Sequence, residues 1–458
     1  MYVTLLFDVE DLTDPRADDT TLRIAEIFTE EDAISTMMVV GEKARLYEKR
    51  GRHDLIQALG QHDLALHTNR HSMHPTVAEY LEGLGWDEGI AEAVARERSG
   101  VEDMERIMGQ FPSCWGRGGS TWGPQIAPAL ERLGVPAMIY TFTHLQDRRT
   151  HIHRFCGRPT YYWYFGGYDS TFSDDAAFER GWQEVLDQIT LDQAEDVPWL
   201  SLFVCHPSTV RARTFWDGLN YNHGVNTPPD QWRMSEYRSE ADWYTAQRNL
   251  RRFARGIANM PGVQLRTIRQ MNEMIAPEPT EVAAADLQRL AQQAVAAPVI
   301  RPDGPLASPA EALYLWAAWI AAGRPEGAVP FRYVEGPVDE PPAHVGLLSL
   351  TREQLTSAAL SLGAAVDRSG RLPASVSVAG QALGVGALYR LLAAAVADPS
   401  LDPVTVVDAP TVPALGDVLA EEVREGVPGW MHKPDLNVST HAAYTRLMSW
   451  TLKPAALR

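Results

Sequence analysis

The chain has 458 residues, of which 45% are hydrophobic, and a formal net charge of −18. This length exceeds what a single compact core normally holds, so we expect two or more domains. The negative charge disfavours nucleic acid and anionic membrane as partners, because both bind basic surfaces. The sequence contains no run of about 18 apolar residues, so no membrane span is predicted.

Two further features of the sequence bear on the compartment. The chain begins with Met1 and enters an apolar segment at once, without the basic region and cleavage site of a signal peptide. Three cysteines, Cys114, Cys156 and Cys205, cannot all pair within the chain and lack metal-type spacing. A reducing, cytoplasmic setting is therefore the simplest expectation.

Short apolar runs alternate with amphipathic segments over the first 275 residues. This alternation is typical of an α/β fold with a parallel sheet or barrel. Strands are predicted at residues 2–7, 34–40, 63–66, 136–142, 199–205 and 263–266. Helices are predicted at residues 20–31, 42–60, 88–109, 124–134 and 240–258.

Polar residues follow three of these strands directly. The acidic run from Asp8 to Asp11 follows the first strand, His67 follows the third, and His206 follows strand 199–205. In parallel α/β folds the catalytic side chains collect at the carboxyl ends of the strands. We therefore expect these residues to converge on one face of the sheet.

His67 and His71 are four residues apart, which would place both rings on one side of a helical turn. Two imidazoles and a carboxylate, with space for a water, are the usual composition of a catalytic divalent-metal site. On spacing alone, a solvent-exposed helix face is the alternative interpretation.

Three connections are candidates for binding roles. The Gly-rich loop 112–119 carries Arg117 to the same layer as the strand ends, or leaves it as a surface arginine. The aromatic tract 161–165, which includes Tyr162 and Trp163, is either a core strand or a stacking wall for a ring-shaped ligand. The long aromatic segment 207–240 is predicted to be a lid.

The composition changes at residues 276–285, which we interpret as a linker. Beyond it, the segment 312–318 (Ala-Leu-Tyr-Leu-Trp-Ala-Ala) returns 75 residues later as 387–393 (Ala-Leu-Tyr-Arg-Leu-Leu-Ala). We therefore predict a smaller, mostly α-helical domain over residues 286–458 with an internal duplication. It contains no cluster of acids and histidines, so no chemistry is placed there.

Four motifs in residues 1–275 resemble those of the polysaccharide deacetylase family, the NodB-type enzymes of the carbohydrate esterase 4 kind. They are Phe7-Asp8-Val9-Glu10-Asp11, His67-Thr68-Asn69-Arg70-His71, Trp115-Gly116-Arg117-Gly118-Gly119 and Leu202-Phe203-Val204-Cys205-His206-Pro207. The resemblance implies a distorted (β/α) barrel. It also implies a metal-dependent hydrolase that removes an acetyl group from an N-acetylated sugar or glycan.

The resemblance also implies roles for individual residues. Asp8 would be the general base, His206 the general acid, and Arg117 the residue that orients the base. His67, His71 and either Glu10 or Asp11 would hold a divalent metal, Zn²⁺ first, with Co²⁺, Ni²⁺ and Mn²⁺ as alternatives. The substrate would contact three aromatic residues, namely Trp122, Tyr162 and Trp163.

The sequence departs from the family pattern at three places. The usual adjacent pair of aspartates is spread over Asp8 to Asp11, which leaves the acidic ligand open. The third motif continues as Gly118-Gly119-Ser120 instead of the usual Pro-Tyr. An Asp-x-x-Asp-Trp motif is not recognised, Asp147 being a poor candidate. Hydrolysis of a non-sugar C–N bond, or an inactive binding protein on the same fold, are the alternative functions.

The second C-terminal repeat, residues 371–392, faintly resembles pseudomurein-binding cell-wall repeats. This resemblance implies a domain that binds a glycan or a partner, and a purely structural role is the alternative. The expected partners of the whole chain are a small-molecule or glycan substrate, and the oligomeric state is left open.

Overall fold

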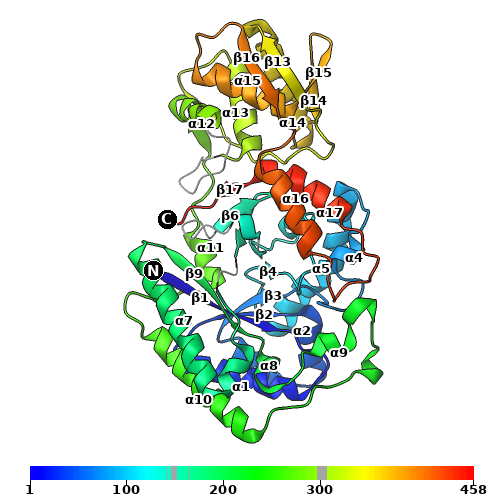
Figure 1. The fold of residues 1–458 in the computed structure, drawn as a ribbon, viewed down its shortest axis with the longest axis vertical. Coiled ribbons are helices and arrows are strands. Elements are labelled where there is room, and N and C mark those ends of the chain that lie inside the picture. The colour runs from blue at the N-terminus through cyan, green and yellow to red at the C-terminus, as the bar shows by residue number, and fades with distance from the viewer. Residues whose placement is uncertain (141, 146–151, 163–164, 297–306) are drawn as a thin grey trace.

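The computed structural model describes residues 1–140, 142–145, 152–162, 165–296 and 307–458. Its centre is a curled sheet with the strand order β17-β6-β7-β5-β4-β3-β2-β1-β9-β8, and β10 pairs with β1 (Figure 1). All of these pairings are parallel except the two made by β6, with β7 and β17. The predicted α/β fold, a distorted and open (β/α) barrel, is therefore confirmed.

The strands of this sheet are short apart from β1 and β9, which pair with each other near its β8 edge. They are β1 (Tyr2–Val9), β2 (Thr36–Val39), β3 (Asp63–Leu66), β4 (Trp115–Gly116), β5 (Met138–Ile139), β6 (Ile152–Phe155), β7 (Arg158–Tyr161), β8 (Phe165–Gly166), β9 (Trp199–Cys205), β10 (Gln264–Leu265) and β17 (Lys453–Pro454). Every residue of β9 is buried, and so is every residue of β1 except the first, Tyr2. Parallel strands with neighbours on both sides are covered on both faces of the sheet.

The helices of the barrel region lie between its strands along the chain. They are α1 (Arg16–Glu30), α2 (Gly41–Lys49), α3 (His53–Leu59), α4 (Val77–Tyr80), α5 (Trp86–Met108), α6 (Ile126–Arg132), α7 (Asp175–Ala194), α8 (Pro207–Arg211), α9 (Trp216–Asn220), α10 (Glu240–Ala258) and α11 (Ile268–Met274). Four 3₁₀ turns complete the connections: η1 (Thr143–Leu145), η2 (Asp169–Ser173), η3 (Asn222–Gly224) and η4 (Pro229–Gln231).

The predicted helix 42–60 is two helices in the structure. The C-cap Arg50 ends α2, and Gly51 follows with φ +68°, a left-handed conformation that helical residues do not adopt. The chain resumes as α3 at His53. The predicted lid 207–240 contains α8, α9, η3 and η4, so it is a series of short helical turns and not an unstructured loop.

The C-terminal region is mixed in content but predominantly helical. Its helices are α12 (Ala284–Ala296), α13 (Pro309–Ala321), α14 (Arg352–Ser369), α15 (Val385–Ala397), α16 (Leu415–Gly426), α17 (Ser439–Met448) and η5 (Ser449–Thr451). Its strands form three two-stranded pairs, built from β11 (Glu281–Ala283), β12 (Ala328–Pro330), β13 (His344–Leu350), β14 (Ser375–Val378), β15 (Gln381–Gly384) and β16 (Val404–Ala409).

The two copies of the sequence repeat both lie in helices, in α13 and α15. These helices pack on each other, and the rings of Trp316 and Tyr389 lie 5.1 Å apart. The preceding hairpin of the second copy, β14–β15, corresponds to positions that fall partly outside the described residues. The duplication therefore stays a prediction.

The last part of the chain returns to the barrel. Figure 1 shows α16 and α17 beside α4 and α5, while α12 to α15 form a lobe above them. The ring of Tyr444 in α17 lies 5.3 Å from that of Trp86 in α5. The strand β17 then adds to the barrel sheet beside β6. Among the helices described, none has the length and apolarity to cross a membrane.

Candidate metal and active site

Four of the predicted side chains meet at the carboxyl end of the sheet. Asp8 and Glu10 stand at the end of β1, His67 follows β3, and His206 follows β9. The Nε2 atom of His67 lies 3.2 Å from Glu10 Oε2 and 3.6 Å from Asp8 Oδ2. The Nε2 atom of His206 lies 3.7 Å from the same oxygen of Asp8. Because β3, β2, β1 and β9 are neighbours and parallel, their ends bring these groups together.

His71 completes the cluster, with its Nε2 atom 2.8 Å from Glu10 Oε2. The predicted helical turn between His67 and His71 is wrong, because residues 67–71 form an irregular turn. Thr68 and His71 have φ values of +57° and +50°, and the backbone N–H of His71 donates to Thr68 Oγ1 at 2.8 Å. This turn, and not helical spacing, brings the two imidazoles to one point.

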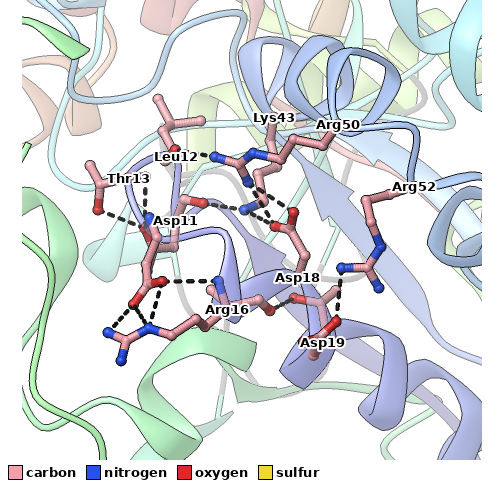
Figure 2. Close-up of polar contacts among 12 residues, drawn as sticks. Asp11, Leu12, Thr13, Arg16, Asp18, Asp19, Lys43, Arg50 and Arg52 are labelled. Atoms are coloured by element: carbon pink, nitrogen blue, oxygen red, sulfur yellow. Dashed lines mark hydrogen bonds and ion pairs between the residues drawn. The ribbon is translucent and has the colours of Figure 1, made fainter. Parts of the chain in front are cut away.

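The structure distinguishes Glu10 from Asp11, the two candidates for the acidic ligand. The carboxylate of Asp11 accepts hydrogen bonds from Thr13 N (2.9 Å), Thr13 Oγ1 (3.0 Å) and Asp14 N (3.2 Å), as Figure 2 partly shows. Its carbonyl accepts a bond from Lys43, which also pairs with Asp18 at 2.8 Å. Asp11 thus closes the loop after β1, while Glu10 faces the histidines.

The two carboxylates of the cluster have different electrostatic surroundings. Burial raises the pKa of Asp8, although the charges of His67 and His206 oppose the shift. Burial also acts on Glu10, but the charges of His71 and His206 and the hydrogen bond from His67 outweigh it and hold the Glu10 pKa well below its usual value. Glu10 therefore stays ionised to a lower pH than Asp8, and Asp8 accepts a proton more readily.

The imidazole of His206 is held by an aspartate that the sequence analysis missed. Asp169, in η2, accepts hydrogen bonds from His206 N (2.7 Å) and Thr209 Oγ1 (2.6 Å), and its Oδ1 lies 3.0 Å from His206 Nδ1. Burial alone would lower the pKa of His206, but the charge of Glu10 and the bond to Asp169 raise it to about 10. This shift favours the protonated imidazole of His206 at neutral pH.

Two residues of α9 were not predicted as site residues: Trp216, which contacts the cluster, and Asp217, which is linked to it by Ser72. Trp216 donates from Nε1 to Glu10 Oε1 at 3.1 Å, and Asp217 accepts from Ser72 at 2.9 Å. The aromatic content of segment 207–240 was the available signal for this segment, and it does not identify these two positions.

Arg117 does not orient Asp8 in this structure, contrary to the expectation from the family. No ion pair joins Arg117 to Asp8 within the described residues, and the guanidinium lies 4.9 Å from the centre of the Tyr140 ring. Gly118 instead approaches the site: a Cβ at this position would lie 2.7 Å from His71 Cδ2. The loop after β4 therefore contacts the cluster through its backbone.

Of the three aromatic residues predicted to contact substrate, two are described, and both are buried against other aromatic side chains. Trp122 is fully buried and stacks on Tyr140 with ring centres 3.7 Å apart. Tyr162 is 1% exposed, and its hydroxyl lies 2.9 Å from His153 Nδ1. Both side chains belong to the hydrophobic core, and their contact with a substrate stays a prediction. Trp163 and Asp147 lie outside the described residues.

The residues present fit a divalent cation. One ligand atom each from Glu10, His67 and His71 lies within 4.8 Å of the others, and all three side chains are buried. Asp8 adds a buried oxygen, Oδ1, that has no hydrogen-bond partner in the described part of the chain. Two imidazole nitrogens with a carboxylate oxygen suit Zn²⁺ and its neighbours Co²⁺ and Ni²⁺, and also Mn²⁺.

No family model and no curated protein sequence matches this chain, so the likeness of residues 371–392 to pseudomurein-binding repeats is without support. Among solved structures, the polysaccharide deacetylase Bc1974 from Bacillus cereus is 16% identical, with 45% of this chain and 79% of that chain covered and a TM-score of 0.29. PuuE allantoinase is 13% identical, with 44% and 77% covered and a TM-score of 0.31. The 4-alpha-glucanotransferase from Thermococcus litoralis is 11% identical, with 58% and 39% covered and a TM-score of 0.40. Likenesses this weak do not place the chain in a family or indicate a reaction.

Proposed function

We propose that this protein is a metal-dependent amide hydrolase that removes an acyl group, with an N-acetylated sugar or glycan as the first substrate to test. The observation that carries the proposal is the convergence of Asp8, Glu10, His67, His71 and His206 at one buried point. The four motifs that resemble the deacetylase family support the choice of an acetyl group.

The division of roles follows from the surroundings of each group. Glu10, His67 and His71 would hold the cation, which would supply Lewis-acid polarisation of the acyl carbonyl and lower the pKa of a water to about 7. Asp8, with its raised pKa, would take the proton of the attacking water. His206, protonated and held by Asp169, would donate a proton to the departing amine.

The burial of the site favours a second candidate, a small amide without a sugar. Asp8, Glu10, His67 and His71 are between 1% and 3% exposed, and only the side chain of His206 is reached from outside, at 19%. A polymer chain needs an open groove along its length, whereas a small acyl amide or a ureide needs only a pocket. A substrate panel that includes both classes separates the candidates.

The test begins with metal content, because it does not require the substrate. We expect the purified protein to bind one equivalent of Zn²⁺ or Co²⁺, and we expect His67→Ala and Glu10→Gln to lose it. Asp11→Asn is the matched control, since the neighbouring carboxylate only closes a loop. Loss of metal in Asp11→Asn with retention in Glu10→Gln would contradict the assignment.

Activity is then measured as acetate or ammonia release from N-acetylglucosamine, its oligomers, N-acetyl amines and cyclic ureides. We expect Asp8→Asn to keep the metal and to lower kcat by about 10²- to 10⁴-fold, the usual contribution of a general base. Full metal occupancy without hydrolysis of any compound, unchanged by Asp8→Asn, would favour the inactive binding protein.

A further inference from the structure

The short helix α9 packs against the candidate metal ligands. Trp216 is 2% exposed, and its ring centre lies 5.6 Å from that of His71. Its indole Nε1 donates to Glu10 Oε1 at 3.1 Å, which leaves Oε2 of the same carboxylate facing the two imidazoles. The segment that follows His206 thus determines which oxygen of Glu10 points to the ligand cluster.

Asp217, the next residue of α9, is linked to His71 by the hydroxyl of Ser72. Ser72 Oγ donates to Asp217 Oδ2 at 2.9 Å, so the only hydrogen of this hydroxyl is used. The Ser72 oxygen, 2.7 Å from His71 Nδ1, must then accept a hydrogen bond from that nitrogen. His71 accordingly carries its proton on Nδ1, and the lone pair of Nε2 is free to bind a cation.

His67 and His71 differ in the hydrogen bonding of their Nδ1 atoms. The Nδ1 atom of His67 has no hydrogen-bond partner within the described ranges, and it lies beside Gly116, where a Cβ would be 3.2 Å away. Only His71 is backed by a carboxylate. Asp217 is itself 1% exposed, and its second oxygen, Oδ1, has no partner in the same ranges. Its other oxygen, Oδ2, accepts the hydrogen bond from Ser72. A buried carboxylate is costly without nearby positive charge, so the position of Asp217 suits a site that gains a cation.

We propose that Asp217, acting through Ser72, and Trp216 are positioning residues of the metal centre. Asp217 and Ser72 fix the tautomer and ring orientation of His71, and Trp216 fixes the carboxylate of Glu10. The inference rests on the proposed function, because it assumes that the cluster binds a cation. It assigns to α9, in the predicted lid, a part in metal affinity.

The experiment measures the affinity of the full-length protein for Co²⁺ by competition with a chromophoric chelator. Loss of a partner behind a metal ligand typically weakens metal binding by about 10- to 100-fold. We expect a loss of this size in Ser72→Ala and in Asp217→Ala. We expect Asp217→Asn, which keeps an oxygen acceptor for Ser72, to recover most of the affinity, and Trp216→Phe to weaken binding independently.

A double variant separates a relay from a general structural effect. If Asp217 acts through Ser72, the double variant of Ser72→Ala with Asp217→Ala loses no more affinity than Ser72→Ala alone. Additive losses would contradict the relay. Asp230→Asn is the matched control, because this exposed carboxylate lies in the same segment and has no contact with the cluster among the contacts of the described residues.

The possible results distinguish the two proposals. Co²⁺ binding by the wild type with unchanged affinity in Ser72→Ala and Asp217→Ala would overturn the positioning role and leave the proposed function intact. No Co²⁺ binding by the wild type would overturn both. Thermal unfolding of each metal-free variant shows whether it is folded. If Asp217→Ala does not fold, the affinity of Ser72→Ala, the smallest change, tests the positioning role.

Discussion

Asp8 and Glu10 are two residues apart where β1 ends, Asp8 within the strand and Glu10 directly after it, and their side chains reach the same point. In an extended strand, alternate residues share a face, which explains how both carboxylates enter one site. Their partners then separate them: Glu10 faces two imidazoles and an indole N–H, whereas Asp8 has one unpartnered oxygen among the described residues. A strand end can thus supply two acids of different strength.

The pairing of His206 with Asp169 predicts a change in pH dependence. In Asp169→Asn the negative charge beside Nδ1 is lost, so the raised pKa of His206 should fall. A general acid works only while protonated, so activity is lost as the pH rises through its pKa. We therefore expect the alkaline limb of the kcat–pH profile to move to lower pH in Asp169→Asn. A limb at the wild-type position would show that His206 is not the proton donor.

The control for this experiment is Asp174→Asn. Asp174 follows the same η2 turn and caps α7 by accepting from Ala177 N at 2.7 Å, and among the described contacts it has none with His206. This variant should leave the profile unchanged. A shift in both variants would indicate that the turn itself, and not the charge of Asp169, determines the profile.

The sequence identified the residues whose position follows from strand ends. Asp8, His67 and His206 each come directly after an apolar run, and parallel strands align such ends. Asp169, Trp216 and Asp217 could not be found in this way, because their partners are 37, 206 and 145 residues away along the chain. Such contacts depend on how loops fold over the sheet, and hydrophobic periodicity contains no information on them.

At the scale of the elements, the turn after β3 is held by the long helix α5. Glu97 of α5 is 3% exposed and accepts hydrogen bonds from Asn69 N at 3.0 Å and Trp115 Nε1 at 2.9 Å. One carboxylate thereby links the histidine turn to β4. The prediction of a strong helix at residues 88–109 was correct to within two residues, but it assigned no role to this buried acid.

Glu97 also predicts a pH dependence of stability. Burial raises its pKa from 4.5 to about 7, against the opposing hydrogen bond from Trp115. Between these values the native state binds more protons than the unfolded state, so the free energy of unfolding falls as the pH rises from about 4.5 to 7. The change attributable to Glu97 is at most roughly 3 kcal/mol.

Glu97→Gln removes this titration and keeps an oxygen acceptor. We expect the loss of stability between pH 5 and pH 8, measured by urea unfolding, to be smaller in Glu97→Gln than in the wild type. Glu102→Gln, an exposed position on the same helix, should behave like the wild type. Equal slopes in all three proteins would mean that Glu97 is ionised throughout this range.

At the scale of the whole molecule, the C-terminal segment contacts loops on the face that holds the site. Glu422 of α16 accepts a hydrogen bond from His144 N, 2.7 Å away, in the connection after β5. Lys433 N donates to Glu79 at 2.8 Å, and His223 N, in the predicted lid, donates to Trp430 O at 2.6 Å. The composition change at residues 276–285 gave no sign that the chain returns, because a return path depends on tertiary contacts.

Met431 is the residue of the C-terminal segment that packs on the loop after β4, next to the candidate metal site. It is 1% exposed, its sulfur accepts from Ser120 N at 3.3 Å, and a Cβ on Gly119 would lie 2.7 Å from it. Gly118, on the other side of the same loop, packs on the ring of His71. The loop after β4 is therefore enclosed between the C-terminal segment and a candidate ligand.

We therefore expect Met431→Ala to affect both stability and metal binding. The cavity left by the side chain should lower the free energy of unfolding by about 2–5 kcal/mol. Met234→Ala, at a position 53% exposed, should change it by less than about 0.5 kcal/mol. Relaxation of the loop should also weaken Co²⁺ binding in Met431→Ala. Wild-type affinity in a destabilised Met431→Ala would show that the C-terminal segment supports the barrel without supporting the site, because the loop would then hold His71 by itself.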